Sequence, residues 1–143
     1  MRGLFVTFEG GEGGGKSTQI ELLRAYLESE GFEVVVTREP GGTPIAERIR
    51  TVLLDAGNAA LTPMAELMLY EAARAQHVGE LIVPTLEKGS IVLCDRYSDS
   101  TIAYQGAGRN LSGDDVAALN GLATGGLLPN LTFLMDLPAE IGL

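Results

Sequence analysis

The sequence has few basic residues and a single cysteine, and each shortage excludes a class of protein. Among 143 residues, Asp and Glu outnumber Lys and Arg by 19 to 10, so the net charge is −9. Because DNA and RNA binding needs a broad cationic surface, we expect no nucleic-acid partner. Cys94 cannot form an intramolecular disulfide, and its apolar neighbours favour a small buried side chain over a reactive thiol.

Long apolar stretches are also missing, which bears on membranes and export. No apolar run approaches the roughly 18 residues of a membrane span. The stretch Leu4–Phe8 is too short for a signal peptide and runs directly into glycines. We therefore expect a cytoplasmic protein with no membrane partner. The length fits one domain, residues 1–143, with one hydrophobic core.

Strand and helix patterns alternate along the chain. The predicted strands cover Leu4–Phe8, Val34–Val36, Ile91–Cys94 and Leu131–Met135. Helices are predicted for residues 16–29, for about Pro44–Leu54, for a longer stretch after Thr62-Pro63, and for a stretch that Ser112 opens. This alternation predicts an α/β fold, a three-layer α/β/α arrangement with a parallel sheet. The glycine-rich run Gly10–Ser17 after the first strand makes the P-loop NTPase type the expected form of that fold.

Apolar spacing also predicts which positions are buried. We expect the strand Val34–Val36 to be buried on both faces. In the helices, apolar residues recur at helical spacing, as Ile45, Ile49 and Leu53 do in one helix and Val116, Leu119 and Leu122 do in another.

The segment after the first predicted strand matches G-x-x-x-x-G-K-[ST], the pattern of a phosphate-binding loop. It runs Gly10-Gly11-Glu12-Gly13-Gly14-Gly15-Lys16-Ser17, with Thr18 next, between a strand and a helix as the mechanism requires. Its glycines let backbone N–H groups turn toward a phosphate, and the helix dipole adds positive potential. We expect ATP here, with Lys16 at the β- and γ-phosphates and Ser17 as a ligand of Mg²⁺.

Charged residues follow two further strands. Arg38 comes after Val34–Thr37, and Asp95 and Arg96 come after Ile91–Cys94. Because the carboxyl ends of parallel strands meet at one edge, two guanidinium groups there can clamp the phosphate of an acceptor. Taken singly, each arginine fits a solvated surface cation equally well. Asp95 fits an aspartate that holds Mg²⁺ through water, and it also fits a simple turn cap.

Two other classes of nucleotide enzyme lack their signatures. The sequence contains no Asn-Lys-x-Asp tetrapeptide of guanine-specific GTPases. It also lacks the His-Arg-Asp loop of protein kinases, since its only histidine is His77.

Four segments together closely resemble thymidylate kinase. They are Phe8-Glu9-Gly10 through Thr18, Thr37-Arg38-Glu39-Pro40-Gly41-Gly42-Thr43, Asp95-Arg96-Tyr97, and Ala103-Tyr104-Gln105-Gly106. The resemblance implies transfer of the γ-phosphoryl group of ATP to dTMP, giving dTDP for dTTP biosynthesis, with Mg²⁺ and in a homodimer. The residues themselves leave two alternatives open: a kinase for another nucleoside monophosphate, or a non-catalytic nucleotide-binding fragment.

The resemblance also implies roles for individual residues. Arg38 and Arg96 would hold the acceptor phosphate, and with Lys16 and Asp95 they form the expected catalytic set. Arg74 would hydrogen-bond the base. The remaining expected substrate contacts are Glu12 near the sugar or metal, Tyr70 stacked on thymine, Thr101 at the pyrimidine, and Tyr104 and Gln105 near the sugar.

Four positions of the region after Thr62 have a less definite reading. Tyr70 lies at helical spacing from Leu67, so a place in the core is an alternative to stacking on the base. Leu67 and Leu81 are expected candidates for the dimer interface. His77 follows the family pattern but has no assigned chemistry, and we take it as structural.

One position and the end of the sequence depart from the full family pattern. In one form of the family a catalytic arginine lies in the phosphate loop, and in the other it lies in a mobile lid. Gly13 stands where the loop arginine would be, so the chain resembles the lid-dependent, mostly bacterial form. The sequence stops at Leu143, so we expect the C-terminal lid and last strand to be missing, either because this is a fragment or because the protein is short.

Overall fold

The computed structural model describes residues 2–11, 15–97 and 111–135 of the chain. These residues divide into two compact units. The first unit takes its residues from Met1–Arg38, Pro84–Tyr97 and Leu128–Leu143, and the second from Glu39–Val83 and Ser98–Leu127. Each unit is described by itself, and the expectation of one domain stays a prediction.

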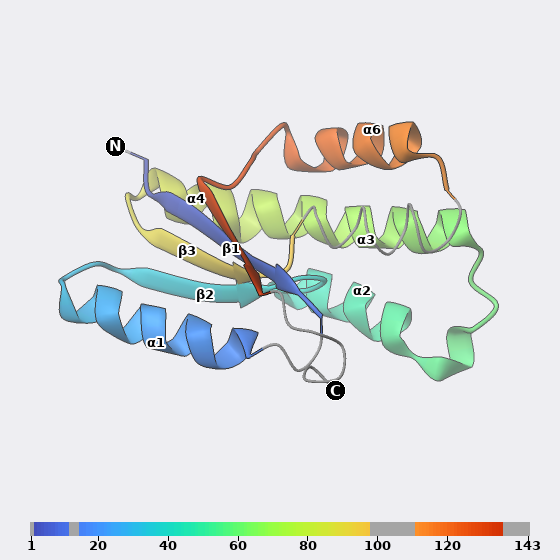
Figure 1. Ribbon diagram of the computed structural model, residues 1–143. Helices are drawn as coiled ribbons and strands as arrows, with labels where there is room; N and C mark the ends of the chain where they lie inside the picture. Colours follow the sequence, from blue (N-terminus) through green and yellow to red (C-terminus); the bar gives the residue numbers. More distant parts are fainter. Residues whose placement is uncertain (1, 12–14, 98–110, 136–143) are drawn as a thin grey trace. The chain divides into compact units, whose positions relative to one another are not determined.

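A parallel sheet forms the first unit. Its strands are β1 (Leu4–Gly10), β2 (Val34–Arg38), β3 (Ile91–Asp95) and β4 (Leu131–Met135). They lie in the order β2-β3-β1-β4, and every neighbouring pair is parallel (Figure 1). The parallel sheet with flanking helices confirms the predicted α/β fold.

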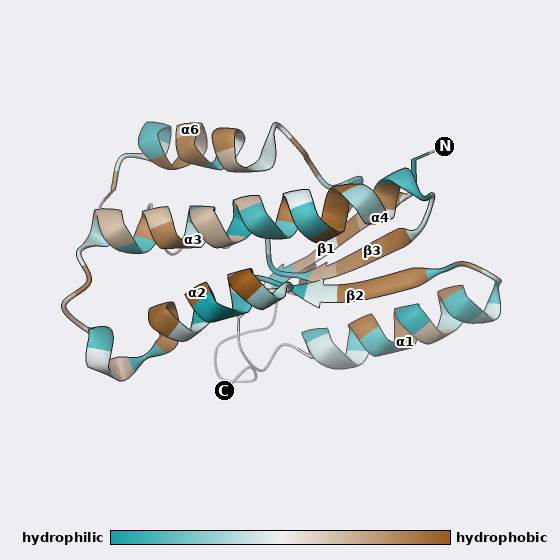
Figure 2. Ribbon diagram, turned by 180° about the vertical axis from the view of Figure 1, so that it is seen from behind, coloured by the Kyte–Doolittle hydropathy of each residue, from teal (hydrophilic) through white to brown (hydrophobic). Residues whose placement is uncertain are grey.

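Helix α1 (Lys16–Ser29) packs on this sheet through an apolar cluster. The cluster joins Ile20 to Val6, Phe8, Ile91 and Leu93 of the two central strands, with Leu23, Leu27 and Val34 packed against it. Figure 2 shows the strands largely in the hydrophobic colour, whereas α1 alternates along its length. Each buried side chain of this size contributes about 1.5–3 kcal/mol, so the cluster anchors the helix to the sheet.

The edge strands are less buried than expected. Val36 of β2 is 40% exposed, and Val34 and Val35 are only partly buried. The expectation that Val34–Val36 is buried on both faces was therefore wrong, because β2 is an edge strand with β3 as its one neighbour in the described sheet. At the other edge, β4 stacks Phe133 on Phe8, with 5.2 Å between ring centroids.

Three longer helices make up most of the second unit. They are α2 (Pro44–Leu54), α3 (Pro63–His77) and α6 (Gly113–Thr124), and α3 packs against both of the others (Figure 1). Short 3-10 helix η1 (Ala56–Asn58) follows α2. Thr43 and Thr62 cap α2 and α3 by accepting the backbone N–H groups of Ala46 and Ala65, and a proline follows each cap.

The helical path continues beyond α3 through the π-helical turn η2 (Val78–Ile82) and α4 (Val83–Glu87). A long helix after Thr62 was expected, but its π turn was not. Pro84 has no N–H to donate to the carbonyl of Glu80, so the regular α-helical pattern cannot run unbroken past that point.

Apolar positions at helical spacing are not all buried. Ile45 is 50% exposed and Leu122 is 82% exposed, whereas Ala46, Val116 and Thr124 are buried. Apolar spacing finds a helix but places its buried face only to within about one position per turn. Within the described residues, no helix is long and apolar enough to cross a membrane.

Candidate phosphate-transfer site

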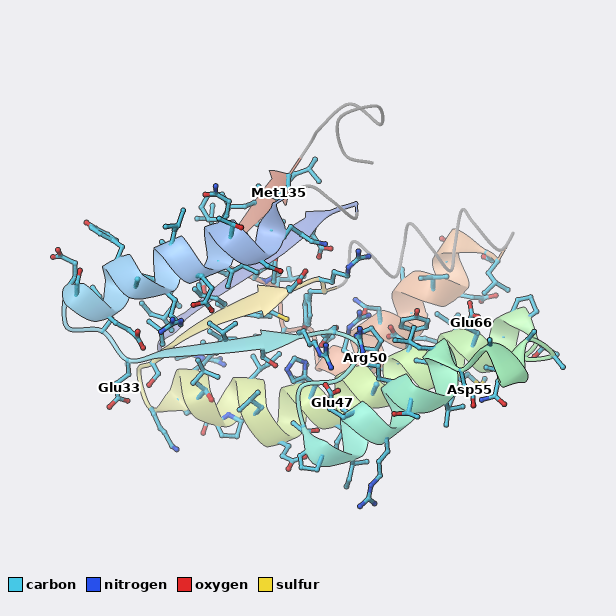
Figure 3. All side chains as sticks on the ribbon, turned by 90° about the horizontal axis from the view of Figure 1, so that it is seen from below. Glu33, Glu47, Arg50, Asp55, Glu66 and Met135 are labelled. Carbon is cyan, nitrogen blue, oxygen red and sulfur yellow. The ribbon has the colours of Figure 1, made fainter. Side chains whose placement is uncertain are left out.

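The phosphate loop leaves β1 and enters α1. Gly10 has φ 140°, and a Cβ atom there would lie 2.7 Å from the carbonyl oxygen of Met135. Gly15 has φ 81°, so both positions require glycine. Gly11 is exposed between them, while Glu12, Gly13 and Gly14 lie outside the described residues. Met135 ends β4 (Figure 3), and the register makes it the partner of Gly10 in β1.

The start of α1 presents backbone donors. Its first helical bond runs from the N–H of Gln19 to the carbonyl of Gly15, 3.1 Å apart, so the N–H groups of Lys16, Ser17 and Thr18 precede the helical ladder. The first turn holds no acidic residue, and no side chain caps it. This end of the helix dipole is positive and suits an anion such as phosphate.

Lys16 is held inside the first unit by two oxygen atoms. Its Nζ donates to the carbonyl of Gly10 at 2.9 Å and lies 3.3 Å from Oδ1 of Asp95. The Lys16 side chain is 8% exposed and the Asp95 side chain 30%. Oδ1 of Asp95 is buried and accepts no hydrogen bond from any described residue, so the contact with Lys16 is an ion pair without hydrogen-bond geometry.

The strand register gathers the other predicted charges at the same sheet edge. Arg38 of β2 is the direct partner of Asp95 in β3, and Asp95 is also the partner of Phe8 in β1. Arg96 follows one residue later. Arg38 is exposed and Arg96 is partly buried. Both arginines therefore lie at the carboxyl edge of the sheet, where the phosphate loop also begins.

The turn after β3 is fixed by two buried contacts. Arg96 has φ 73°, a left-handed conformation that is unfavourable for a residue with a side chain. Its N–H donates to the carbonyl of Phe8 at 2.9 Å, and the N–H of Tyr97 donates to the carboxylate of Glu9 at 2.8 Å. Strained turns of this kind persist where surrounding bonds hold them, and they are frequent at functional sites.

Sequence reasoning gave no role to Glu9 or Tyr97. Glu9 is 3% exposed and Tyr97 is 1% exposed, and the Tyr97 ring meets Phe5 edge-on at 5.0 Å. The sequence did contain one signal for Glu9: it is a carboxylate inside the apolar strand Leu4–Gly10. A charge buried in such a strand needs a partner, so a contact for Glu9 could have been predicted. Cys94 is buried, as expected, and its Sγ lies 3.0 Å from the carbonyl oxygen of Arg96.

In the second unit, the segment that follows Arg38 is tied to helix α2. Gly42 donates its N–H to Oε2 of Glu47 at 2.7 Å, and Arg50 donates to the carbonyl of Pro40 at 2.9 Å. Glu47 and Arg50 both belong to α2 (Figure 3). Gly41 and Gly42 have φ values of 131° and 97°, which explains the paired glycines.

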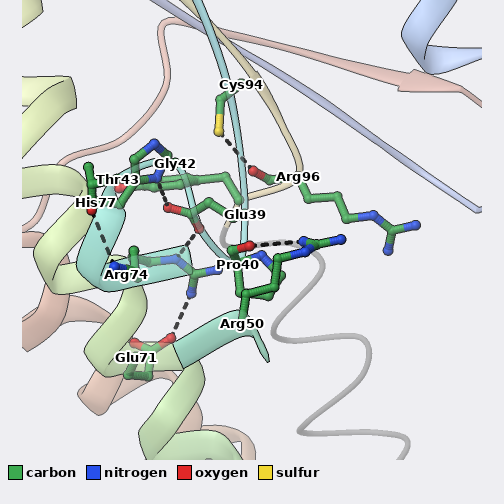
Figure 4. Close-up of polar contacts among 12 residues, drawn as sticks. Glu39, Pro40, Gly42, Thr43, Arg50, Glu71, Arg74, His77, Cys94 and Arg96 are labelled. Carbon is green, nitrogen blue, oxygen red and sulfur yellow. Dashed lines mark hydrogen bonds and ion pairs between the residues drawn. The ribbon is translucent and has the colours of Figure 1, made fainter. Parts of the chain in front are cut away.

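A buried polar cluster surrounds Arg74 of helix α3 in the second unit (Figure 4). Arg74 Nε donates to Oε1 of Glu39 at 2.6 Å, and Nη1 donates to Oε1 of Glu71 and Oδ1 of Asn120, each at 2.6 Å. His77 Nδ1 lies 2.7 Å from the second carboxylate oxygen of Glu39. We call these five residues the Arg74 cluster, and sequence reasoning foresaw only Arg74 among them.

The surroundings of Glu71 in the Arg74 cluster shift the pKa of its carboxyl. Burial raises the pKa of the Glu71 carboxyl above its ordinary value of 4.5; Arg74 opposes this shift, and the negative charge of Glu39 adds to it. Oε2 of Glu71 is buried and accepts no hydrogen bond from the described residues. The cluster therefore has a surplus of buried carboxylate, which makes the single guanidinium of Arg74 its central group.

The structure leaves several predicted contacts untested. Tyr70 is partly buried, which is compatible both with stacking on a base and with a place in the hydrophobic core. A contact between Arg74 and a base stays a prediction. Thr101, Tyr104 and Gln105 lie outside the described residues.

One expected position of the dimer interface was wrong. Leu67 is fully buried within the chain, at 0% exposure, and so has no surface to offer a second copy. Leu81 is partly buried. The exposed large hydrophobic side chains on α3 are Met64, at 37%, and Met68, at 54%.

The residues at the sheet edge fit a magnesium ion that arrives with a nucleotide. No group of three or more His, Cys, Asp or Glu side chains gathers within the described ranges, so the chain offers no complete metal cage there. Mg²⁺ usually takes one or two protein oxygens together with water and substrate phosphates. The exposed hydroxyl of Ser17 and the unsatisfied Oδ1 of Asp95 are oxygen donors of that kind.

Comparison with known proteins gives a consistent result. The sequence profile of the family described as thymidylate kinase matches residues 8–143. The chain is 61% identical over 141 residues to a thymidylate kinase of Geotalea daltonii, covering 99% of this chain and 66% of that protein. It is 57% identical over 143 residues to a thymidylate kinase of Pseudomonas fluorescens, covering 100% of this chain and 68% of that protein.

A solved structure is also similar. The crystal structure of thymidylate kinase from Ehrlichia chaffeensis matches with a TM-score of 0.87 and 41% identity, covering 95% of this chain and 76% of that one. The chain spans 66% of the length of the Geotalea daltonii protein and 63% of the length of a thymidylate kinase from Citrifermentans bemidjiense, slightly less than two thirds in each case.

Proposed function

Because the chain belongs to the thymidylate kinase family, we propose that the protein transfers the γ-phosphoryl group of ATP to dTMP, giving ADP and dTDP for dTTP biosynthesis. One observation carries this proposal. The phosphate loop with its buried Lys16, the carboxylate of Asp95, and two arginines all lie at the carboxyl edge of one parallel sheet. An edge with that composition suits two phosphate groups, one from a donor and one from an acceptor.

Lys16 would act on the donor side. In the structure its ammonium group is held by Gly10 and Asp95, so it is already oriented at the mouth of the loop. A phosphate bound at the start of α1 would offer Lys16 a stronger anionic partner than a backbone carbonyl. Lys16 would then offset charge on the β- and γ-phosphates as the transferred group leaves.

Arg38 and Arg96 would act on the acceptor side. We propose that they hold the phosphate of dTMP so that one of its oxygens faces the γ-phosphorus in line with the bond that breaks. The attacking oxygen forms a bond to phosphorus, the bond to the β–γ bridging oxygen breaks, and ADP leaves. Positioning and charge neutralisation supply the catalysis, and no covalent enzyme intermediate is needed.

Ser17 and Asp95 are the proposed holders of Mg²⁺. When bound, the ion would neutralise charge on the donor phosphates. Asp95 has a second task that needs no metal, because its ion pair keeps Lys16 in the loop before nucleotide binds.

The base and sugar of dTMP would be read by residues that the family resemblance suggests. Arg74 would donate to a carbonyl oxygen of the base, and Tyr70 would stack on its ring. The further proposed contacts are Glu12, Thr101, Tyr104 and Gln105, and the proposed loop residues for ATP are Gly10, Gly11, Gly13, Gly14, Gly15 and Thr18. We also propose a homodimer, and we expect the enzyme to act in the cytoplasm, where ATP and dTMP are both available.

A panel of acceptors tests the function. We expect ADP release from ATP and Mg²⁺ to be fastest with dTMP, slower with dUMP, and close to background with dCMP, dAMP and dGMP. Faster turnover with another base would identify a kinase for that nucleoside monophosphate instead. ATP binding without turnover on any acceptor would support the reading of a non-catalytic nucleotide-binding chain.

A further inference from the structure

We propose that Glu39 and His77 are positioning residues that hold the Arg74 guanidinium in the orientation needed to read the base. This inference rests on the proposed function, because it gives the base contact of Arg74 a structural cause. It assigns chemistry to the single histidine of the chain and to the carboxylate that directly follows Arg38.

Glu39 lies between Arg74 and His77 and contacts both side chains. One oxygen of its carboxylate accepts from Arg74 Nε at 2.6 Å, and the other lies 2.7 Å from His77 Nδ1 (Figure 4). Arg74 and His77 stand three residues apart on α3, so they share one helix face. A carboxylate only accepts, so Nδ1 of His77 carries the hydrogen of this bond.

Burial makes this arrangement specific. Arg74 is 3% exposed, Glu39 4% and His77 0%. Without the bond from His77, one oxygen of a buried carboxylate would lack a donor, and Glu39 would be drawn to rotate. Arg74 would then turn toward Glu71, whose Oε1 it already contacts at 2.6 Å. His77 therefore acts on Arg74 through Glu39.

Orientation matters because a guanidinium group only donates hydrogen bonds. Held in place, it suits a pyrimidine that presents a carbonyl oxygen at position 4, as thymine and uracil do. Cytosine presents an amino group there, so two donors would face each other. A site whose polar groups are fixed rejects a mismatched partner more strongly than one that can turn away. Glu39 and His77 are thus expected to sharpen selection of dTMP against dCMP.

Two substitutions at His77 separate positioning from simple packing. H77N keeps an N–H donor at nearly the place of Nδ1, whereas H77F fills the volume of the ring without any donor. Q76A is a matched control, because Gln76 is the preceding residue of α3 and donates to the exposed side chain of Glu80 at 2.8 Å, away from the Arg74 cluster. Unfolding midpoints report stability, and calorimetry on the protein gives separate dissociation constants for dTMP, dCMP and ATP.

We expect H77F to weaken dTMP binding by about tenfold, equivalent to about 1.4 kcal/mol, while the dissociation constant for ATP stays at its parental value. H77N should restore dTMP binding, and Q76A should leave it unchanged. The preference for dTMP over dCMP should shrink in H77F. A purely structural role would lower the unfolding midpoint of H77F without this split between the two ligands.

A nuclear magnetic resonance signal tests the same idea without ligand. The Nε–H resonance of Arg74, assigned by its loss in R74K, should be protected from solvent exchange in the parent and in H77N, and should exchange faster in H77F. Folded H77F with parental dTMP binding and a protected resonance would overturn the proposal. If H77F does not fold, H77N decides: a folded H77N that loses dTMP binding would equally overturn it.

The proposed function can fail separately. A parent that binds ATP but not dTMP would refute the dTMP assignment, and the resonance of Arg74 would still show whether His77 holds the guanidinium through Glu39. A parent that binds dTMP, with H77F indistinguishable from it, would leave the function standing and remove only the positioning role.

Discussion

Replacing Lys16 by methionine removes the ammonium group and keeps most of the length of the side chain. Two contacts disappear with it: the 2.9 Å hydrogen bond to the carbonyl of Gly10 and the 3.3 Å ion pair with Asp95. Methionine is a better test than alanine, because it leaves little empty volume where the buried stem of Lys16 packs. Any loss of activity then reports the charge.

The structure sets the size of the two effects. A hydrogen bond to a charged group contributes about 1.5–3 kcal/mol, and partial exposure of Asp95 lets water screen the pair, so K16M should lower the free energy of unfolding by about 1–2 kcal/mol. A domain with roughly 5–15 kcal/mol of stability remains folded after that loss. Removing one charge-stabilising donor from a transfer site costs about 10²–10³ in kcat, so catalysis should fall far more than folding.

Denaturant unfolding and ADP release at saturating ATP, Mg²⁺ and dTMP measure both quantities on the same samples. The only other lysine, Lys88, is exposed and supplies the control K88M, which should match the parent in both assays. A folded K16M with the parental kcat would refute the role of Lys16. An inactive K88M would show that the assay responds to something other than the phosphate loop.

Three further predictions concern Glu71, base selection and assembly. Burial raises the pKa of Glu71, so its stabilising contribution is complete below pH 4.5 and is lost as pH rises through the raised value. E71Q should therefore unfold at higher denaturant than the parent at pH 8, with the difference vanishing near pH 4; an equal difference at both pH values would contradict this. Reading the thymine methyl group is worth about 0.8 kcal/mol, so the preference for dTMP over dUMP should be tens-fold at most, and a thousandfold preference would refute burial as its source. For assembly, M68E places a charge on an apolar side chain that is 54% exposed and should lower the mass of a homodimer to that of a monomer in sedimentation, whereas a monomeric parent would end the dimer proposal.

Local signals predicted most of the secondary structure. The bounds Pro44–Leu54 of α2 and Leu131–Met135 of β4 matched the expectation, because a Thr-Pro cap and a short apolar run between turn residues are local features. Burial was harder. Val36 lies on an edge strand, and a run of three valines contains nothing that tells an edge strand from a central one.

The residues of the candidate site also fall into two groups, those that local patterns predict and those that they do not. The loop Gly10–Ser17 and the charges after β2 and β3 are local patterns, and the register places Arg38 opposite Asp95 as the parallel sheet requires. The Arg74 cluster depends on pairs such as Glu39 and His77, which are 38 positions apart. No spacing rule connects such residues, so only the folded chain reveals that they meet.

Direct identification of the product tests the central claim most closely. The protein, ATP, Mg²⁺ and dTMP are incubated together, and the nucleotides are separated and quantified over time. The account predicts that dTDP and ADP accumulate in equal amounts and that both form about 10²–10³ times more slowly in K16M. Release of ADP and inorganic phosphate without dTDP would contradict it, since the chain would then be a nucleotide hydrolase rather than a kinase of dTMP.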